Sequence, residues 1–222
     1  MYSIAIDGPA GAGKSTIAKT IAKKLGFVYV DTGAMYRAIA LYFLRKRVDG
    51  KDAQTIEKMC PDIHVTLEYQ DGEQQVLLNG ENVSSFIRTE EVSAMASLTS
   101  AQPAVRAALL QLQRDMAKSA DILMDGRDIG THVLPNADLK IYLTASVSVR
   151  AKRRYQEMIE KGVSCELSEI EQDIKERDHQ DMTREIAPLK KAEDAYLLDS
   201  SDLSIEEVVD AVITAFHEKT GA

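Results

Sequence analysis

The chain has 222 residues, with 27 Lys or Arg against 35 Asp or Glu, so its formal net charge at pH 7 is −8. This charge argues against a protein held to nucleic acid or to an anionic membrane by bulk positive charge, because such binding needs clustered cations. No apolar run approaches the roughly 18 residues that span a bilayer, and the first residues lack the pattern of a signal peptide. We therefore expect a soluble, cytoplasmic protein with no nucleic-acid or membrane partner.

The first 47 residues alternate between strand and helix patterns. Short apolar runs at 3–7 and 27–31 are typical of buried strands. Between them, apolar residues recur every four positions from 14 to 25, and Gly26 follows where a helix commonly ends. A further helix is predicted over 33–47. This rapid alternation predicts a parallel α/β architecture.

The middle of the chain interrupts that alternation. Apolar residues alternate with polar or small ones over 63–69, and the dipeptides Asp71-Gly72 and Asn79-Gly80 are typical of hairpin turns. We expect an antiparallel meander of about three short strands, inserted into the α/β domain.

The remaining residues return to helices and parallel strands. Strands are predicted at 121–125, 138–144 and 195–199. Helices are predicted at 90–99, 103–118, 147–161 and 169–184, and from 204 to about 219. Capping boxes are predicted for two of these helices, formed by Ser168 with Glu171 and by Ser204 with Glu207. The expected fold is thus a five-stranded parallel sheet flanked by helices, plus a small antiparallel inserted sheet.

The two cysteines, Cys60 and Cys165, lie far apart and belong to no CxxC or histidine cluster. We expect two separate thiols rather than a disulfide or a metal site.

The strongest motif is GxxxxGK[ST], which directly follows the first predicted strand and opens the first predicted helix. Glycines allow a tight loop, whose backbone N–H groups and helix N-terminus can face the phosphates of a nucleotide. Lys14 would add a positive charge near the β- and γ-phosphates, and the Ser15 hydroxyl could join the shell of a Mg²⁺ ion. The expected ATP-binding residues are Gly8, Pro9, Ala10, Gly11, Ala12, Gly13, Lys14, Ser15 and Thr16. The motif leaves the choice between ATP and GTP open.

Asp125 ends an apolar strand, which is the form of a Walker B segment. We expect its carboxylate near the metal ion, with a turn-capping role as the alternative. The metal candidates are therefore Ser15 and Asp125.

Arginines gather after two strand ends and on two late helices. They are Arg37, Arg127, Arg150, Arg153, Arg154, Arg177 and Arg184. Arg177, Asp181 and Arg184 have the spacing of one helix face. Solvated helix faces with ion pairs are the ordinary alternative. Transfer of a phosphoryl group between two anions, however, needs cations around both. We expect acceptor-phosphate contacts from Arg37, Arg127, Arg177 and Arg184, and a lid contact from Arg153 or Arg154. The expected catalytic residues are Lys14, Arg127, Arg153, Arg154, Arg177 and Arg184.

Several of these segments resemble the bacterial cytidylate (CMP) kinases, and the likeness covers almost the whole chain. They include IDGPAGAGKST, DTGAMYR, DGRDIGT and IKERDHQDMTR. The resemblance implies a P-loop kinase with strand order 2-3-1-4-5 in the parallel sheet. It also implies a monomer that transfers the γ-phosphoryl group of ATP·Mg²⁺ to CMP or dCMP, giving CDP or dCDP in pyrimidine nucleotide metabolism. Its single domain would comprise a core (1–59, 84–154 and 166–222), a monophosphate-binding insert at about 60–83 and a lid at about 155–165.

The resemblance also implies residue roles. Acceptor-phosphate contacts fall on Thr32, Arg37, Arg127, Arg177 and Arg184, cytosine contacts on Ser97, Arg106 and Asp128, and the sugar-hydroxyl contact on Asp181. Asp128 and Ser97 could accept from the cytosine N4 amino group while Arg106 donates to the ring acceptors. Uracil reverses the donor and acceptor pattern at position 4 and at N3. Such mismatches in a site built around hydrogen bonds can favour the matching base by as much as roughly 10⁴-fold.

Two alternatives stay open at this point. One is a kinase for another small acceptor, such as UMP or a non-nucleotide. The other is a nucleotide-binding switch or scaffold without turnover.

Overall fold

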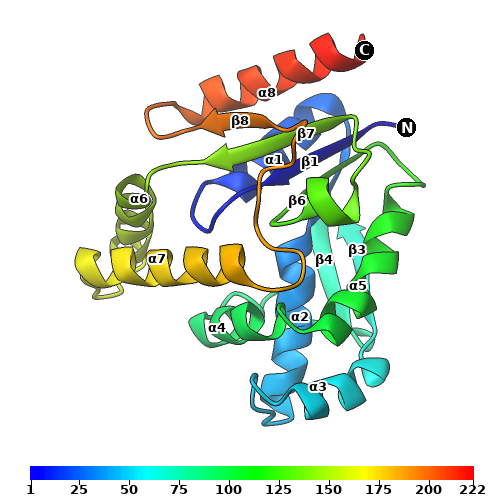
Figure 1. The fold of residues 1–222 in the computed structure, drawn as a ribbon, viewed down its shortest axis with the longest axis vertical. Coiled ribbons are helices and arrows are strands. Elements are labelled where there is room, and N and C mark those ends of the chain that lie inside the picture. Colours follow the sequence, from blue (N-terminus) through cyan, green and yellow to red (C-terminus); the bar gives the residue numbers. More distant parts are fainter. The chain divides into compact units, whose positions relative to one another are not determined.

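The computed structural model describes all 222 residues, and the chain divides into two compact units (Figure 1). The first, here called the sheet unit, contains Met1–Tyr29 and Ala120–Ala222. The second, here called the meander unit, is Val30–Ser119. No helix is long and apolar enough to cross a bilayer. Cys60 and Cys165 are both free thiols.

The main sheet has five strands in the order β2-β6-β1-β7-β8. Their bounds are β1 Ser3–Asp7, β2 Val28–Asp31, β6 Ile122–Gly126, β7 Leu139–Thr144 and β8 Tyr196–Asp199. Strand β1 is parallel to both of its neighbours, so that Ile4 is paired with Leu123 on one side and with Leu139 on the other. Counted along the chain, these strands stand in the order 2-3-1-4-5, which confirms the predicted parallel sheet.

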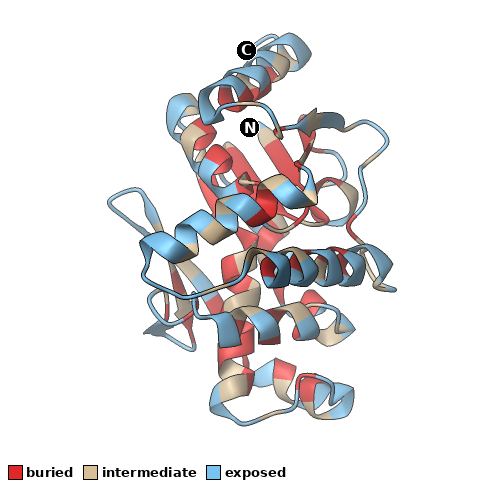
Figure 2. Cartoon of the chain, turned by 90° about the vertical axis from the view of Figure 1, so that its left-hand side faces the viewer, coloured by how far each residue is buried: buried red, intermediate tan, exposed pale blue.

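Continuous apolar runs place β1, β6 and β7 inside the sheet unit, as expected for strands covered on both faces. The edge strand β8 is largely exposed. Ile4 and Ile6 of β1 are buried and form a core with helices α1 (Lys14–Leu25) and α8 (Ile205–Thr220). The buried residues of α8 lie along one side of the helix (Figure 2). Gly26 ends α1 in the left-handed conformation, with φ 73°. The first predicted helix therefore has the bounds expected from its four-residue repeat.

Three further helical segments complete the sheet unit: η2 (Ile129–Val133), α6 (Val147–Glu160) and α7 (Leu167–Thr183). Ala151 of α6 and Ile170 and Ile174 of α7 form a second small core, against which Leu167 also packs.

The two predicted capping boxes have different outcomes. Ser204 and Glu207 form theirs in full at the start of α8, which confirms the prediction. The prediction of a Ser168–Glu171 box is wrong, because α7 already begins at Leu167 and Glu166 is its N-cap. Packing of Leu167 against the small core draws Ser168 into the first turn, where a hydroxyl cannot cap the helix.

The meander unit contains the predicted antiparallel sheet, with strand order β3-β4-β5. Its strands are β3 Val65–Gln70, β4 Glu73–Leu78 and β5 Glu81–Asn82. Both predicted turn dipeptides have positive φ at each residue, including 53° at Asp71 and 50° at Asn79. These values are what two-residue hairpin turns of the I′ type require.

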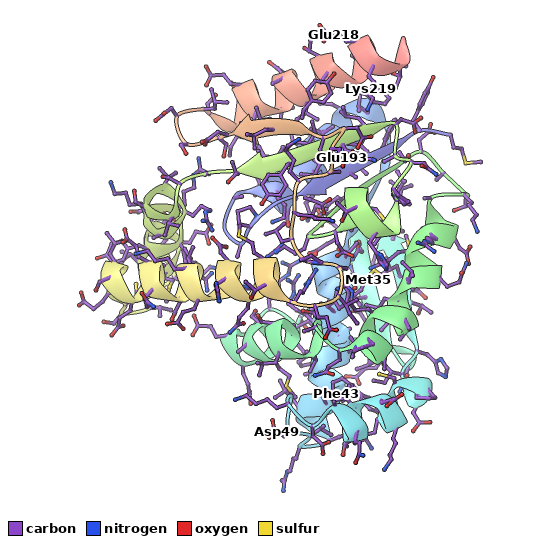
Figure 3. The ribbon with its side chains drawn as sticks, viewed as in Figure 1. Met35, Phe43, Asp49, Glu193, Glu218 and Lys219 are labelled. Carbon is purple, nitrogen blue, oxygen red and sulfur yellow. The ribbon has the colours of Figure 1, made fainter.

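Four α-helices and a short 3-10 turn make up the rest of this unit. They are α2 Thr32–Arg45, α3 Ala53–Met59, η1 Cys60–Asp62, α4 Glu90–Thr99 and α5 Pro103–Met116. Met35 and Phe43 are fully buried along α2, which packs against α4, α5 and β4 (Figure 3). Helix α3 was not among the predicted elements. It has only seven residues, too few for a clear periodic pattern, and starts where the Asp52 carboxylate accepts from the Thr55 N–H.

Candidate active site

The glycine-rich loop between β1 and α1 adopts a conformation that side chains would prevent. Gly8, Gly11 and Gly13 have φ values of 155°, 74° and 84°. A Cβ atom on Gly8 would lie 1.9 Å from the carbonyl oxygen of Leu143. Gly13 precedes α1 and no side chain caps that helix, so its first N–H groups can bind an anion. The loop thus has the shape and polarity of a phosphate cradle, and residues 8–15 are called the phosphate loop below.

Lys14 is buried at the start of α1, and its Nζ donates to the carbonyl oxygen of Pro9 at 2.8 Å. Burial, followed by the positive charge of Arg127, lowers the pKa of Lys14 to about 7, although Asp125, Asp181 and Asp7 oppose this shift. An added polyanion would favour the charged ammonium and raise this pKa again. The lysine is therefore well suited to bind phosphate.

Ser15 and Asp125, the two expected metal ligands, lie within hydrogen-bond distance of each other. The Ser15 hydroxyl donates to Oδ2 of Asp125 at 2.9 Å, and the Tyr29 hydroxyl donates to Oδ1 at 2.9 Å. Hydroxyl and carboxylate oxygens are the hard ligands that Mg²⁺ prefers, so this pair fits a Mg²⁺ ion brought in with a nucleotide. Sequence reasoning did not find Tyr29, whose only signal was an aromatic residue in a buried strand.

Asp7 is a second buried carboxylate that sequence reasoning missed. It ends β1 and accepts from the N–H groups of Ile129 at 2.8 Å and Gly130 at 2.7 Å. Burial raises the pKa of Asp7 to about 6, although these two N–H groups lower it. Asp7 thus links the start of the phosphate loop to the segment that follows β6. The sequence signal that could have found Asp7 was the same as for Asp125, a carboxylate at the end of an apolar strand.

A cluster of opposite charges forms in the sheet unit around Asp181, which is buried on α7. Arg127 Nε donates to Asp181 Oδ2 at 2.8 Å. Arg184 Nη1 lies 3.7 Å from Asp181 Oδ1, and its Nη2 lies 3.5 Å from Asp128 Oδ1. Burial alone would raise the pKa of Asp181, but the positive charges of Arg127, Arg184 and Arg177 hold it below its ordinary value. The structure therefore brings together five predicted residues of this unit.

The two predicted lid arginines lie on α6 with different surroundings. Arg153 Nη2 donates to the carbonyl oxygen of Ser200 at 2.7 Å, so its guanidinium holds the chain just after β8. Arg154 is exposed, with its Nη1 3.7 Å from Oε2 of Glu157.

In the meander unit, Asp31 organises the residues at the start of α2. Its Oδ1 accepts from the Ala34 N–H at 2.8 Å, and its Oδ2 accepts from Arg37 Nη2 at 3.0 Å. The Nε of Arg37 is buried and has no hydrogen-bond partner. Arg88, which sequence reasoning did not single out, lies 3.7 Å from the same Asp31 oxygen. Thr32 is the buried first residue of α2.

The predicted base-contacting residues of the meander unit lie on α4 and α5. Arg106 is buried on α5, with its guanidinium 5.6 Å from the ring centroid of Tyr36 and its Nη1 donating to the carbonyl oxygen of Ser100 at 3.2 Å. Ser97 lies on α4, one turn before Ser100. These four residues offer an aromatic face, a buried cation and hydroxyl groups.

The parallel sheet, the strand–phosphate loop–helix order and the Ser15–Asp125 pair define a P-loop nucleotide-binding protein. Comparison with known proteins narrows this class. The model of the family described as cytidylate kinase matches residues 4–218. The cytidylate kinase of Caldicellulosiruptor bescii is 49% identical over 216 residues, which cover 97% of this chain and 96% of that protein. The cytidylate kinase of Lactobacillus johnsonii is 50% identical over 219 residues, which cover 99% and 95%.

The chain belongs to the cytidylate kinase family. It is accordingly a nucleoside monophosphate kinase, a phosphotransferase. A solved structure of an uncharacterized protein from Eubacterium ventriosum agrees at the level of the fold, with a TM-score of 0.56 at 11% identity over 97% of this chain and 98% of that one.

Proposed function

We propose that the chain transfers the γ-phosphoryl group of ATP·Mg²⁺ to CMP or dCMP, giving CDP or dCDP, and so serves pyrimidine nucleotide metabolism. The observation that carries this proposal is the charged cluster of the sheet unit, in which Arg127 Nε donates to Asp181 Oδ2 at 2.8 Å and whose charges act on the buried Lys14. The pKa of Lys14 in the phosphate loop responds to both Arg127 and Asp181, which belong to the expected acceptor contacts. Lys14, which we expect to contact the donor phosphates, is therefore close enough to two expected acceptor contacts for their charges to shift its pKa.

On the donor side, the phosphate loop and Thr16 would hold the phosphates of ATP through backbone N–H groups and Lys14. Ser15 and Asp125 would hold the Mg²⁺ ion. When bound, this ion neutralises negative charge on the β- and γ-phosphates.

On the acceptor side, we assign phosphate contacts to Thr32, Arg37, Arg127, Arg177 and Arg184. The buried Nε of Arg37 supports its assignment, because an N–H group without a partner is poised to donate to an added oxygen. Asp181 has a lowered pKa and so stays ionised, which suits a carboxylate that accepts from a sugar hydroxyl.

For the base, we assign Asp128 and Ser97 as acceptors for the N4 amino group of cytosine and Arg106 as donor to its ring acceptors. The burial of Arg106 and Asp128 supports this assignment, because a desolvated donor or acceptor penalises a base that presents the wrong partner.

In the reaction, an oxygen of the acceptor phosphate attacks the γ-phosphorus of ATP, and the bond from that phosphorus to the bridging oxygen of ADP breaks. No covalent enzyme intermediate forms. Lys14, Arg127, Arg177 and Arg184 stabilise the charge on the transferring group. Of the two α6 arginines assigned to the lid, Arg154 is the better candidate for the same task, because Arg153 already donates to Ser200.

The test is a steady-state assay of the purified protein with ATP·Mg²⁺ and CMP, dCMP, UMP or AMP. We expect diphosphate formation with CMP and dCMP, and much lower kcat/KM with UMP and AMP. Faster reaction with UMP would overturn the base assignment. Nucleotide binding without any diphosphate product would favour a switch or scaffold. Sedimentation of the same sample tests the monomer that we propose, and the cytoplasm is the proposed location because these nucleotides are present there.

A further inference from the structure

Arg150 joins three segments of the sheet unit from a buried position near the start of α6, where it is 3% exposed. Its Nε donates to the carbonyl oxygen of Ala145 at 2.8 Å, and its Nη1 donates to the carbonyl oxygen of Ala10 at 2.9 Å. Its Nη1 and Nη2 also donate to the two carboxylate oxygens of Asp178, at 3.1 Å and 2.6 Å. One guanidinium therefore contacts the chain before α6, the phosphate loop and α7.

The contact with Ala10 fixes the orientation of a peptide group inside the phosphate loop. A trans peptide places its C=O and N–H on opposite sides. Holding the Ala10 oxygen toward Arg150 therefore turns the Gly11 N–H away from it. A Cβ atom on Gly11 would lie 3.5 Å from the Cβ of Arg150, so the loop and α6 are in close contact here. Because a phosphate cradle works through N–H groups set in direction before the ligand arrives, this contact preorganises the loop.

The contact with Asp178 fixes the rotation of α7. Asp178 is buried, follows Arg177 directly and precedes Asp181 by almost one helical turn. A bidentate pair of arginine and carboxylate is specific in both distance and angle, which a lysine could not reproduce. The pair therefore also determines where Arg177 and Asp181 are presented.

We infer that Arg150 is a positioning residue for the kinase reaction, which holds the phosphate loop and α7 in one arrangement through Ala10 and Asp178. The inference rests on the proposed function and goes beyond it, since neither Arg150 nor Asp178 is among the residues assigned to a substrate. The competing interpretation is a buried ion pair that serves the fold alone.

The experiment compares the double variant Arg150→Met/Asp178→Leu with the unmodified protein. Removing both charges together avoids an unpaired buried ion, so we expect the double variant to keep its fold. Titration calorimetry with ATP·Mg²⁺ alone measures the Kd for the donor, and steady-state assays measure kcat and the KM for CMP. We expect a Kd for ATP·Mg²⁺ about tenfold weaker, as for loss of a charge-assisted hydrogen bond, together with a lower kcat.

Two further variants sharpen the result. Lys24→Met removes an exposed ion pair of the same unit, between Lys24 and Asp210, and we expect its Kd and kcat within twofold of the unmodified protein. Arg150→Lys keeps the charge but loses the fork geometry, so we expect ATP·Mg²⁺ binding to be severalfold weaker. If the double variant does not fold, Arg150→Lys alone distinguishes the positioning role from a purely structural ion pair.

A lower melting temperature with Kd and kcat within twofold of the unmodified protein would overturn the inference, as would full function in Arg150→Lys. If the unmodified protein forms CDP in these assays, such results overturn the inference alone. An unmodified protein that binds ATP·Mg²⁺ but forms no CDP would instead contradict the proposed function.

Discussion

The two units differ in how they hold their charged side chains. In the sheet unit, the ion pairs that α7 makes with Arg127 and Arg150 are withdrawn from solvent: the side chains of Arg150 and Asp178 are 4% and 12% exposed. In the meander unit, the side chains of the bidentate pair Arg45 and Glu81 are 41% and 51% exposed. The pair of Arg37 and Asp31 is more shielded from solvent. Buried pairs carry a large desolvation penalty but give precise geometry. We therefore expect the buried pairs of the sheet unit to preorganise it for phosphoryl transfer, and the base-contacting residues Ser97 and Arg106 of the meander unit to contribute, with Asp128, to the choice of acceptor.

This division of roles predicts two kinds of defect. Changes in the phosphate-binding residues of the sheet unit should lower the reaction rate with every acceptor. Changes in the base-contacting residues of the meander unit should alter which acceptor is preferred.

Replacing Lys14 by Met should lower kcat with CMP by about 10³-fold or more, because the transferring group loses a positive charge within a desolvated site. The loss should be equal for CMP and dCMP. A coupled assay of diphosphate formation measures it, with Lys24→Met as the control on the same helix. Activity within tenfold of the unmodified protein would break the assignment of the donor site.

Replacing Arg106 by Met should lower kcat/KM for CMP by about 100-fold, because a buried donor to the base is lost. The preference for CMP over UMP should narrow, while ATP·Mg²⁺ binding in the absence of CMP stays the same. Competition assays with the two monophosphates measure this. Arg45→Met, at the exposed pair of the same unit, should leave the preference unchanged. Unaltered discrimination in the Arg106 variant would place base selection elsewhere.

The lowered pKa of Lys14 predicts proton uptake when ATP·Mg²⁺ binds. Above pH 7 the free protein holds this lysine mostly neutral, and bound phosphates should raise its pKa and return its proton. At pH 8 we expect uptake of up to about one proton per ATP, declining below pH 7 where the lysine is already charged. Calorimetry in buffers of different ionisation enthalpy measures the uptake. Lys14→Met should abolish it, and heats that do not depend on the buffer at pH 8 would contradict the prediction.

The smallest effect concerns stability alone. Ser204→Ala removes the capping box of α8 and should lower the free energy of unfolding by about 1 kcal/mol, with no change in kcat. Urea unfolding measures the difference. Ser168→Ala is the matched control, since Ser168 does not cap α7, and its effect should be smaller. Equal losses in both variants would contradict the assigned helix starts.

Much of the fold could be predicted from the sequence, because long periodic segments carry their own signal. Residues 14–25 gave the bounds of α1, and the two turn dipeptides gave the antiparallel sheet. The seven residues of α3 were too few to show a pattern. The start of α7 depended on the packing of Leu167 against another helix, which overrode a local capping signal.

The site divides in the same way. Motifs of adjacent residues, such as the phosphate loop and Asp125, could be predicted because their chemistry is local. Contacts between distant positions that belong to no motif could not. Arg150 and Asp178 are 28 residues apart, and Asp7 and Gly130 are 123 apart, so no spacing rule connects them.

The most direct test of direct transfer follows the phosphoryl group itself. The protein is mixed with CMP, Mg²⁺ and ATP labelled at the γ-phosphorus, and the products are separated. The account predicts label at the β-phosphate of CDP, with none attached to the protein and little released as inorganic phosphate. Label found mainly as inorganic phosphate, or covalently bound to the protein, would contradict it.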